Sequence, residues 1–157
     1  MSSITLEAIE ARQTELNQLI AQFKADAANQ RTILVIHEAA IGLDPGEHYA
    51  GTILDESGQV VHHLVLMAQR PDTKLKWQKA MDWAASVGGA LPSRQEQALL
   101  YANCKPHLKP EWHWSSETNA DDDSYAWGCY FSDGSQYLGH KSFEGSAAAV
   151  RCIPLIP

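Results

Sequence analysis

Residues 112–152 read WHWSSETNADDDSYAWGCYFSDGSQYLGHKSFEGSAAAVRC, the segment of the chain with the most information about its fold. Seven aromatic residues lie between positions 112 and 137. The segment also contains Ser-Asp-Gly-Ser at 132–135 and an acidic stretch at 117–123. An Asp-Gly pair between two apolar runs is typical of a β-hairpin turn. We therefore predict a hairpin of residues 125–131 and 136–140, preceded by a polar loop.

The first strand of this hairpin has two different faces, because successive side chains of a strand point to opposite sides. One face carries large or apolar side chains, namely Tyr125, Trp127, Cys129 and Phe131. The other face carries Ala126, Gly128 and Tyr130. We expect the first face to lie in the core. Tyr130 then points outward, near Tyr137 and Lys141 across the hairpin.

The remaining pattern predicts a mixed α+β chain. Further strands are expected at 31–41, 48–54, 59–68, 112–115 and 147–153, with the second and third of these joined as a hairpin. A helix is expected at about 74–87, with Asp72 or Thr73 as its N-cap and two glycines at its end. Ser93 and Glu96 form a capping-box pattern that begins a second helix, which extends to about residue 103.

Residues 5–28 predict an amphipathic N-terminal helix. Its apolar stripe follows spacings of three and four, with one polar member: Leu6, Ile9, Gln13, Leu16, Ile20, Phe23 and Ala27. An isolated helix of this length cannot bury such a stripe by itself. It packs either on its own domain or on copies of itself, and in the second case a homotrimer is one expected form. We treat residues 1–30 as a segment of its own and residues 31–157 as the main domain.

Composition and charge exclude several classes of function. The formal net charge is -7, and residues 110–140 contain six acids but no lysine or arginine, which argues against nucleic-acid binding. The chain shows no apolar run long enough for a membrane span. Its start lacks the pattern of a signal peptide. We expect synthesis in the cytoplasm, where the protein either stays or from which it leaves by lysis or by a specialised route.

The cysteines and histidines give no metal-binding motif. Cys104, Cys129 and Cys152 are an odd set without CxxC spacing. Cys129 and Cys152 either form a disulfide between neighbouring strands or are two small buried side chains. His62 and His63 are adjacent, so on a strand they point to opposite faces and cannot hold one metal together.

Four segments carry a resemblance to a known family: LPSRQEQALLYAN at 91–103, WHWSSE at 112–117, SYAWGCYFSDGSQYLGHKS at 124–142 and AAVRCI at 148–153. In order and spacing they resemble a bacterial and phage domain with a C-type-lectin-like fold. The group includes the C-terminal domain of a collagen-like adhesin. It is similar in fold to formylglycine-generating enzymes and to variable receptor-binding proteins of phages. The positions that match are Leu91, Pro92, Ser93, Arg94, Glu96, Trp114, Ser115, Ser116, Tyr125, Ala126, Trp127, Phe131, Ser132, Gly134, Val150 and Arg151.

The resemblance implies a C-type-lectin-like domain with two helices and antiparallel hairpins, preceded by the N-terminal helix. It also implies a prophage or phage tail-fibre role as a non-catalytic, ligand- or receptor-binding module. Such a role implies a virion-associated or extracellular location after release. A cell-surface glycan or protein is the expected ligand, and a tail-fibre protein is a second expected partner. The alternative is a structural or assembly component of a phage tail. A formylglycine-generating-type enzyme is disfavoured, because its reactive cysteines would have to be Cys129 and Cys152, which lie in apolar strands.

The candidate ligand-binding residues combine outward aromatic side chains with the acidic loop. Tyrosine offers a large contact area at a low cost in conformational entropy, and carboxylates accept hydrogen bonds from sugar hydroxyls. The set is Glu117, Asn119, Asp121, Asp122, Asp123, Tyr130, Tyr137 and Lys141. Glu117, Asn119, Asp121 and Asp123 also supply the hard oxygen ligands that Ca²⁺ prefers, although their spacing is not that of an EF-hand. We predict no other cofactor.

Overall fold

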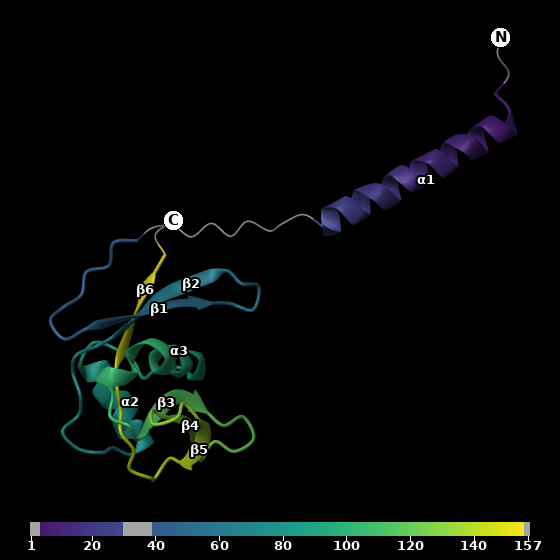
Figure 1. The fold of residues 1–157 in the computed structure, drawn as a ribbon. Coiled ribbons are helices and arrows are strands. Elements are labelled where there is room, and N and C mark those ends of the chain that lie inside the picture. The colour runs from purple at the N-terminus through teal and green to yellow at the C-terminus, as the bar shows by residue number, and fades with distance from the viewer. Residues whose placement is uncertain (1–3, 30–38, 156–157) are drawn as a thin grey trace. The chain divides into compact units, whose positions relative to one another are not determined.

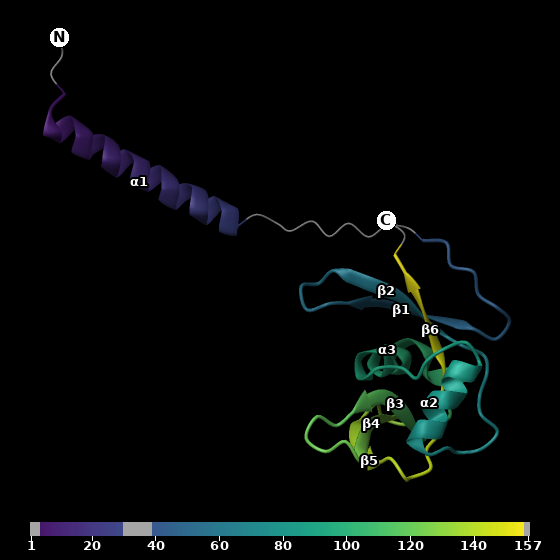
Figure 2. The same cartoon turned by 180° about the vertical axis from the view of Figure 1, so that it is seen from behind.

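Two three-stranded antiparallel sheets and the helix between them organise the main part of the chain, as Figures 1 and 2 show for a computed structural model that describes residues 4–29 and 39–155. The chain divides into two units, residues 1–37 and residues 38–157. The described residues form three α-helices and six strands, which confirms the α+β class. None of these helices is both long enough and apolar enough to cross a bilayer.

The first unit contains α1 (Leu6–Ala28), as the sequence predicts. Thr5 caps this helix, because its hydroxyl accepts a hydrogen bond from the backbone N–H of Ala8 at 3.3 Å. Taken by itself, the helix leaves its apolar side chains exposed, including Ile9, Leu16 and Phe23. Of the strand predicted at 31–41, residues 31–38 lie outside the described residues, and residues 39–41 do not form a strand.

In the second unit, β1 (His48–Leu54), β2 (Val60–Leu66) and β6 (Val150–Pro154) form the first sheet in the order β1-β2-β6. The second sheet has the order β3-β4-β5 and consists of β3 (Trp112–Thr118), β4 (Tyr125–Tyr130) and β5 (Gln136–His140). The two hairpins β1–β2 and β4–β5 confirm the predicted pairings.

The two α-helices of this unit differ in how their N-termini are capped. In α3 (Arg94–Cys104), the predicted capping box is confirmed: the Ser93 hydroxyl accepts from the N–H of Glu96 at 3.1 Å, and the Glu96 carboxylate accepts from the N–H of Ser93 at 2.8 Å. The prediction that Asp72 or Thr73 caps α2 (Trp77–Ser86) is wrong, because that helix begins after Lys76 without a side-chain cap. A short 3₁₀ turn, η1 (Lys105–His107), follows α3.

Two hydrophobic clusters lie on opposite faces of the second sheet. One joins α3 to both sheets through Leu64, Leu100 and Phe131. The other packs Trp112 and Trp114 against α2. The segment of residues 145–149 connects the sheets: the N–H of Met67 bonds to Ala149 O at 2.9 Å, and that of Trp114 bonds to Ser146 O at 2.9 Å. Figure 1 shows this late part of the chain, in yellow, running from β5 past α2 to β6.

The prediction for β4 needs a correction. Cys129 and Phe131 are buried as expected, but Trp127 is only half-buried and Tyr125 is exposed. The opposite face is not free either, because Gly128 lies beneath the indole of Trp112, and Ala126 is buried in the same hydrophobic cluster as Trp112 and Trp114. The strand is therefore covered on both sides at its centre, and only Tyr130 of the second face reaches solvent.

Of the two alternatives for Cys129 and Cys152, the disulfide is wrong, and the description as a buried side chain holds for Cys129 but not for the exposed Cys152. Cys129 lies on β4 and Cys152 lies on β6, and these strands belong to different sheets. Both cysteines are free, as is Cys104. The adjacent histidines behave as predicted: His62 turns toward Glu96 on α3, whereas His63 turns toward Tyr49 and Thr52 on β1.

Candidate ligand-binding site

An open pocket of about 480 Å³ lies beside β5, and most of its lining is aromatic. We call it the aromatic pocket, and it is lined by Trp112, Tyr130, Tyr137, Leu138, Gly139, His140 and Phe143. Tyr130, Tyr137 and Phe143 are 41%, 58% and 56% exposed, so three large rings stand at the surface. The rings of Tyr130 and Tyr137 meet edge to face, with 6.1 Å between their centroids.

The floor of the aromatic pocket is set by strand register. Residue 112 pairs with residue 130, and residue 128 pairs with residue 137, which brings one aromatic residue from each of β3, β4 and β5 together. The indole of Trp112 lies against Gly128, Gly139 and Gly145, where any side chain would collide with it. Trp112 is buried against these glycines, and its ring meets the ring of Phe143 edge to face, with 5.7 Å between the ring centroids. The floor is therefore fixed by packing rather than by a mobile loop.

The structure brings Tyr130 and Tyr137 together, as the sequence predicts, but it places Lys141 elsewhere. The Lys141 ammonium lies 4.0 Å from the centroid of the Trp77 ring on α2, a cation–π contact. Lys141 does not line the aromatic pocket. Its charge therefore helps to attach the end of β5 to α2.

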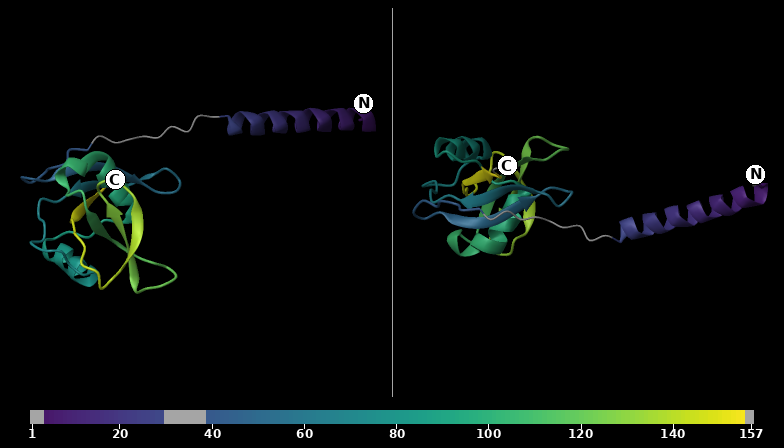
Figure 3. Two further views of the ribbon diagram at one scale, coloured as in Figure 1. Left: turned by 60° about the horizontal axis from the view of Figure 1, so that its bottom comes forward. Right: turned by 90° about the horizontal axis from the view of Figure 1, so that it is seen from above.

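The acidic loop of residues 119–124 connects β3 and β4, and it uses several of its polar groups internally (Figures 1 and 3). Just before it, the Glu117 carboxylate accepts a hydrogen bond from the N–H of Arg94 at 2.5 Å, at the start of α3. Asp122 accepts from the N–H of Ser124 at 3.0 Å and from its hydroxyl at 2.5 Å. The Ser124 hydroxyl is the main cause of the lowered pKa of Asp122, and nearby His140 contributes. The end of the loop thus lies beside the pocket residue His140.

The calcium hypothesis requires the carboxylates of this loop to converge. Within residues 4–29 and 39–155, Glu117, Asp121 and Asp123 do not place their oxygens within 4.8 Å of one another. The amide oxygen of Asn119 faces the N–H of Asp121 at 3.5 Å. The three carboxylates therefore do not converge on one point in this structure, and Glu117 already binds the N-terminus of α3.

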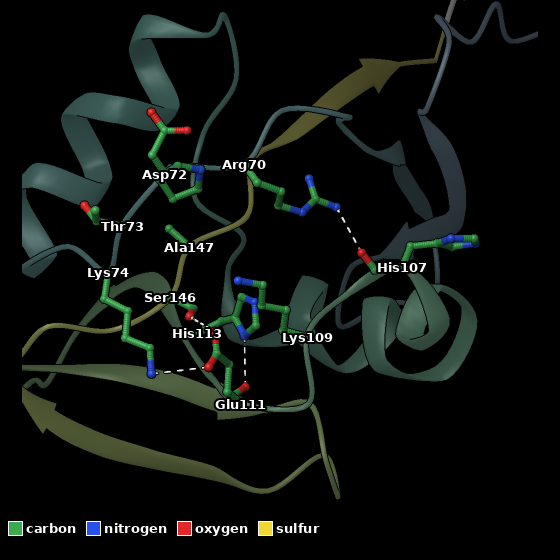
Figure 4. Close-up of a pocket in the computed structure, with 11 residues that line it drawn as sticks. Arg70, Asp72, Thr73, Lys74, His107, Lys109, Glu111, His113, Ser146 and Ala147 are labelled. Carbon is green, nitrogen blue, oxygen red and sulfur yellow. Dashed lines mark hydrogen bonds and ion pairs between the residues drawn. The ribbon is translucent and has the colours of Figure 1, made fainter.

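A second concavity, which we call the polar pocket, has a volume of about 380 Å³ and lies between residues 70–74 and β3 (Figure 4). Glu111 is at its centre: its carboxylate binds Lys74 at 3.2 Å and accepts a hydrogen bond from the Ser146 hydroxyl. These contacts, the one with Ser146 first, lower the pKa of Glu111. Arg70 donates to the carbonyl oxygen of His107 at 3.4 Å.

His113 also borders the polar pocket, and its protonation state follows from its surroundings. Burial lowers its pKa, which favours the neutral ring. Its Nδ1 lies 2.9 Å from the backbone oxygen of Glu111, which can only accept, so Nδ1 carries the proton. Among the described residues, Ser146 and His113 share no hydrogen bond, and each binds Glu111 instead. This arrangement lacks the nucleophile–base contact of covalent catalysis.

Sequence reasoning missed four side chains of the aromatic pocket: Trp112, Leu138, His140 and Phe143. In the hairpin register Leu138 pairs with Trp127 and His140 pairs with Tyr125. Neither partner is a predicted site residue, so the register of β4 and β5 does not mark Leu138 and His140 as part of the site. Phe143 lies beyond the hairpin, and no local pattern marks it.

A comparison of the sequence with models of known protein families and with curated protein sequences finds no match.

Proposed function

We propose that residues 38–157 form a non-catalytic ligand-binding domain with a C-type-lectin-like fold, and that its ligand is a neutral glycan on a cell surface. The observation that carries this proposal is the aromatic pocket. Three exposed rings surround a buried tryptophan there, and large exposed aromatic groups that gather in one place mark binding sites more often than scattered apolar side chains do.

The fold part of the proposal is supported by the roles of the residues that carry the resemblance. Leu91, Trp114 and Phe131 are core residues, and Gly134 adopts the positive φ of 81° that its turn requires. The guanidinium of Arg151 binds the Glu47 carboxylate at 2.7 Å. These positions hold the domain together. They say nothing about its ligand, because one fold serves many functions.

A sugar ring fits the chemistry of the aromatic pocket better than a charged ligand does. The apolar face of a sugar stacks on aromatic rings, and its hydroxyls find partners in the phenols of Tyr130 and Tyr137 and in the ring of His140. The neighbouring acidic loop and the net charge of -7 repel sulfated or phosphorylated ligands. A neutral glycan satisfies both conditions, and a protein that presents a similar surface is the alternative outcome of a binding screen.

A role in a phage or prophage tail fibre follows from the resemblance and gains support from α1. The apolar stripe of this helix has the a/d spacing of a short coiled coil, and its side chains are exposed. A trimer of such helices would display three binding domains on one fibre, and several weak glycan contacts would then act together. In this proposal the chain is made in the cytoplasm and functions on the released particle.

The alternative function, a structural or assembly component of a tail, draws on the same observation. If α1 docks on another fibre protein instead of on copies of itself, the domain would serve as a connector. Glycan binding by the aromatic pocket separates the two functions, because a connector has no reason to bind sugars.

The test is a glycan screen with three proteins: the full chain, Tyr137→Ala and Tyr49→Ala. Tyr49 lies on β1 in the first sheet, is 42% exposed and does not line the aromatic pocket. Loss of binding in Tyr137→Ala, with binding kept in Tyr49→Ala, supports the proposal. Binding that is equal in all three proteins places the ligand elsewhere, and no binding to any neutral glycan contradicts the proposal.

A further inference from the structure

Three side chains that can bind a metal converge where β2, α3 and β6 meet. The Nε2 atom of His62 lies 2.9 Å from Oε1 of Glu96, and the Cys152 sulfur lies 3.5 Å from the same oxygen. The three ligand atoms all lie within 4.8 Å of one another. Since 34 residues separate His62 from Glu96, and 56 separate Glu96 from Cys152, the tertiary fold creates this cluster and no local motif does.

Each of the three side chains is held in place by its own element. Residue 152 pairs with residue 64, two positions from His62, so the two side chains share one face of the first sheet. Glu96 is the third residue of α3, and its Oε2 accepts from the N–H of Ser93 at 2.8 Å as part of the capping box. That bond fixes the carboxylate and leaves Oε1 turned toward His62 and Cys152.

We infer that His62, Glu96 and Cys152 form a binding site for a divalent transition metal of the zinc class. Zinc accepts imidazole nitrogen, thiolate sulfur and carboxylate oxygen, and it is often bound by three protein ligands plus one water or substrate. A thiolate ligand disfavours calcium and magnesium, which bind oxygen ligands. The site is separate from the acidic loop and does not rest on the proposed glycan binding.

Hydrogen bonds to the Glu96 carboxylate hold the cluster together when no metal is bound. Burial, together with the negative charge of Glu96 and its hydrogen bond, raises the pKa of the Cys152 thiol to about 11. The protonated thiol therefore donates to the carboxylate. A bound zinc ion would release this proton to solvent, and its two positive charges would balance the thiolate and the carboxylate. His62 would bind as a neutral imidazole.

The cluster can be reached from solvent. His62 and Glu96 also line an open groove of about 680 Å³, together with Val61, Ser93 and Gln95. Cys152 is an exposed residue, whereas Cys104 and Cys129 are buried. An ion can therefore approach through the groove, and the fourth coordination position can be filled by water or by a further ligand from that side.

The experiment uses the full chain after removal of metal by a chelator. Addition of Co²⁺ should produce the thiolate-to-cobalt charge-transfer absorption and the visible bands of a tetrahedral ion. Zinc affinity is then measured by competition with a coloured chelator. We expect Cys152→Ser to lose the charge-transfer absorption and to bind zinc more than about 100-fold less tightly. Mutation of a residue that only hydrogen-bonds to a metal ligand can already lower metal affinity by up to about 100-fold, and Cys152 is a ligand itself. His62→Ala should also bind less tightly. His107→Ala, which changes an exposed histidine outside the cluster, should match the wild type.

Two results overturn the inference. One is the absence of the charge-transfer absorption in wild-type protein, a measurement that does not depend on any variant folding. The other is equal zinc affinity in the wild type and in a Cys152→Ser protein whose thermal unfolding shows it to be folded, because the metal would then bind elsewhere. If Cys152→Ser does not fold, the His62→Ala and His107→Ala pair decides, and equal affinity in these two proteins rejects the site.

Discussion

The indole of Trp112 lies directly against the α-carbon of Gly128 on the neighbouring strand. A Cβ atom at residue 128 would overlap the six-membered ring of the indole and would lie 2.7 Å from the backbone oxygen of His113. Gly128 therefore serves a close approach between a side chain and a strand, which no larger residue permits. This contact sets the depth of the aromatic pocket, because Trp112 is its floor.

Gly128→Ala should therefore destabilise the domain. Two rigid neighbours, a buried indole and a backbone carbonyl, would have to move, and overpacking of this kind typically costs about 1–3 kcal/mol. The free energy of unfolding from urea titration measures the effect. Gly42→Ala is the matched control, since a Cβ at residue 42 meets nothing within 4 Å. Equal stability of the two variants would show that Trp112 does not pack as described.

The same contact shows where sequence reasoning about β4 succeeds and where it fails. Period-two alternation predicts correctly that Tyr130 points outward and that Phe131 is buried. It fails for Ala126 and Gly128, because small side chains on one face suggested a free surface. The indole that covers Gly128, and the two tryptophans that share a hydrophobic cluster with Ala126, come from β3. A pattern within one strand contains no information about what an adjacent strand places over it.

Sheet order explains the other differences between sequence and structure. The capping box of α3 is a local pattern, and it could be predicted in full. The pairing of β6 with β2 is non-local, so the sequence alone could not separate Cys152 from Cys129 or bring Cys152 beside His62 and Glu96. The acidic loop shows that residues close in sequence need not form one site. Glu117 and Asp122 bind the backbone N–H groups of two different residues, which their spacing in the sequence could not show.

The Glu47–Arg151 pair should make stability depend on pH in the acid range. The carboxylate accepts two hydrogen bonds from the guanidinium, at 2.9 and 2.7 Å, and this contact is the main cause of the lowered pKa of Glu47. A carboxyl whose pKa is lower in the folded state stabilises the fold above its unfolded pKa, and this contribution is lost as the pH falls through the folded value. We therefore expect stability to fall as the pH drops below about 4.3, the reference value for glutamate.

Glu47→Gln tests this assignment. At neutral pH the variant should be less stable by about 2 kcal/mol, the order of a hydrogen bond to a charged partner. The gap to wild type should narrow as the pH falls, because protonation removes the same charge from Glu47. Glu56→Gln, at an exposed turn position, is the control and should keep the acid dependence of the wild type. A gap that stays constant from neutral to acid pH would assign the effect to packing instead.

Self-association should depend on the apolar stripe of α1. We expect the full chain to form homotrimers, and we expect Ile20→Asp to give monomers, because a charge within a coiled-coil seam has no water around it. Gln22→Asp places the same charge on the polar face of the same helix and should leave the trimer intact. Light scattering of the eluted peak measures the mass of each protein. A wild-type monomer, or a trimer that tolerates Ile20→Asp, would contradict assembly through this stripe.

The three cysteines should differ in reactivity. In the native state only Cys152 is exposed, so a thiol reagent should modify one group, and in denaturant it should modify three. Although the residue as a whole is exposed, its sulfur is partly shielded from water. This shielding, and then Glu96, raise the pKa of the Cys152 thiol to about 11, so its reactive thiolate is scarce at neutral pH. Its labelling rate should rise with pH until the pH approaches that value.

Replacement of the neighbouring carboxylate should speed this reaction. Glu96→Gln keeps a hydrogen-bond acceptor beside the sulfur but removes the negative charge, which lowers the thiol pKa and increases the thiolate fraction at neutral pH. Glu117→Gln, which changes an exposed acid of β3 whose carboxylate binds the N–H of Arg94, should label at the wild-type rate. A denatured protein with only one reactive thiol would instead reveal a disulfide and would contradict the separation of Cys129 and Cys152 by the two sheets.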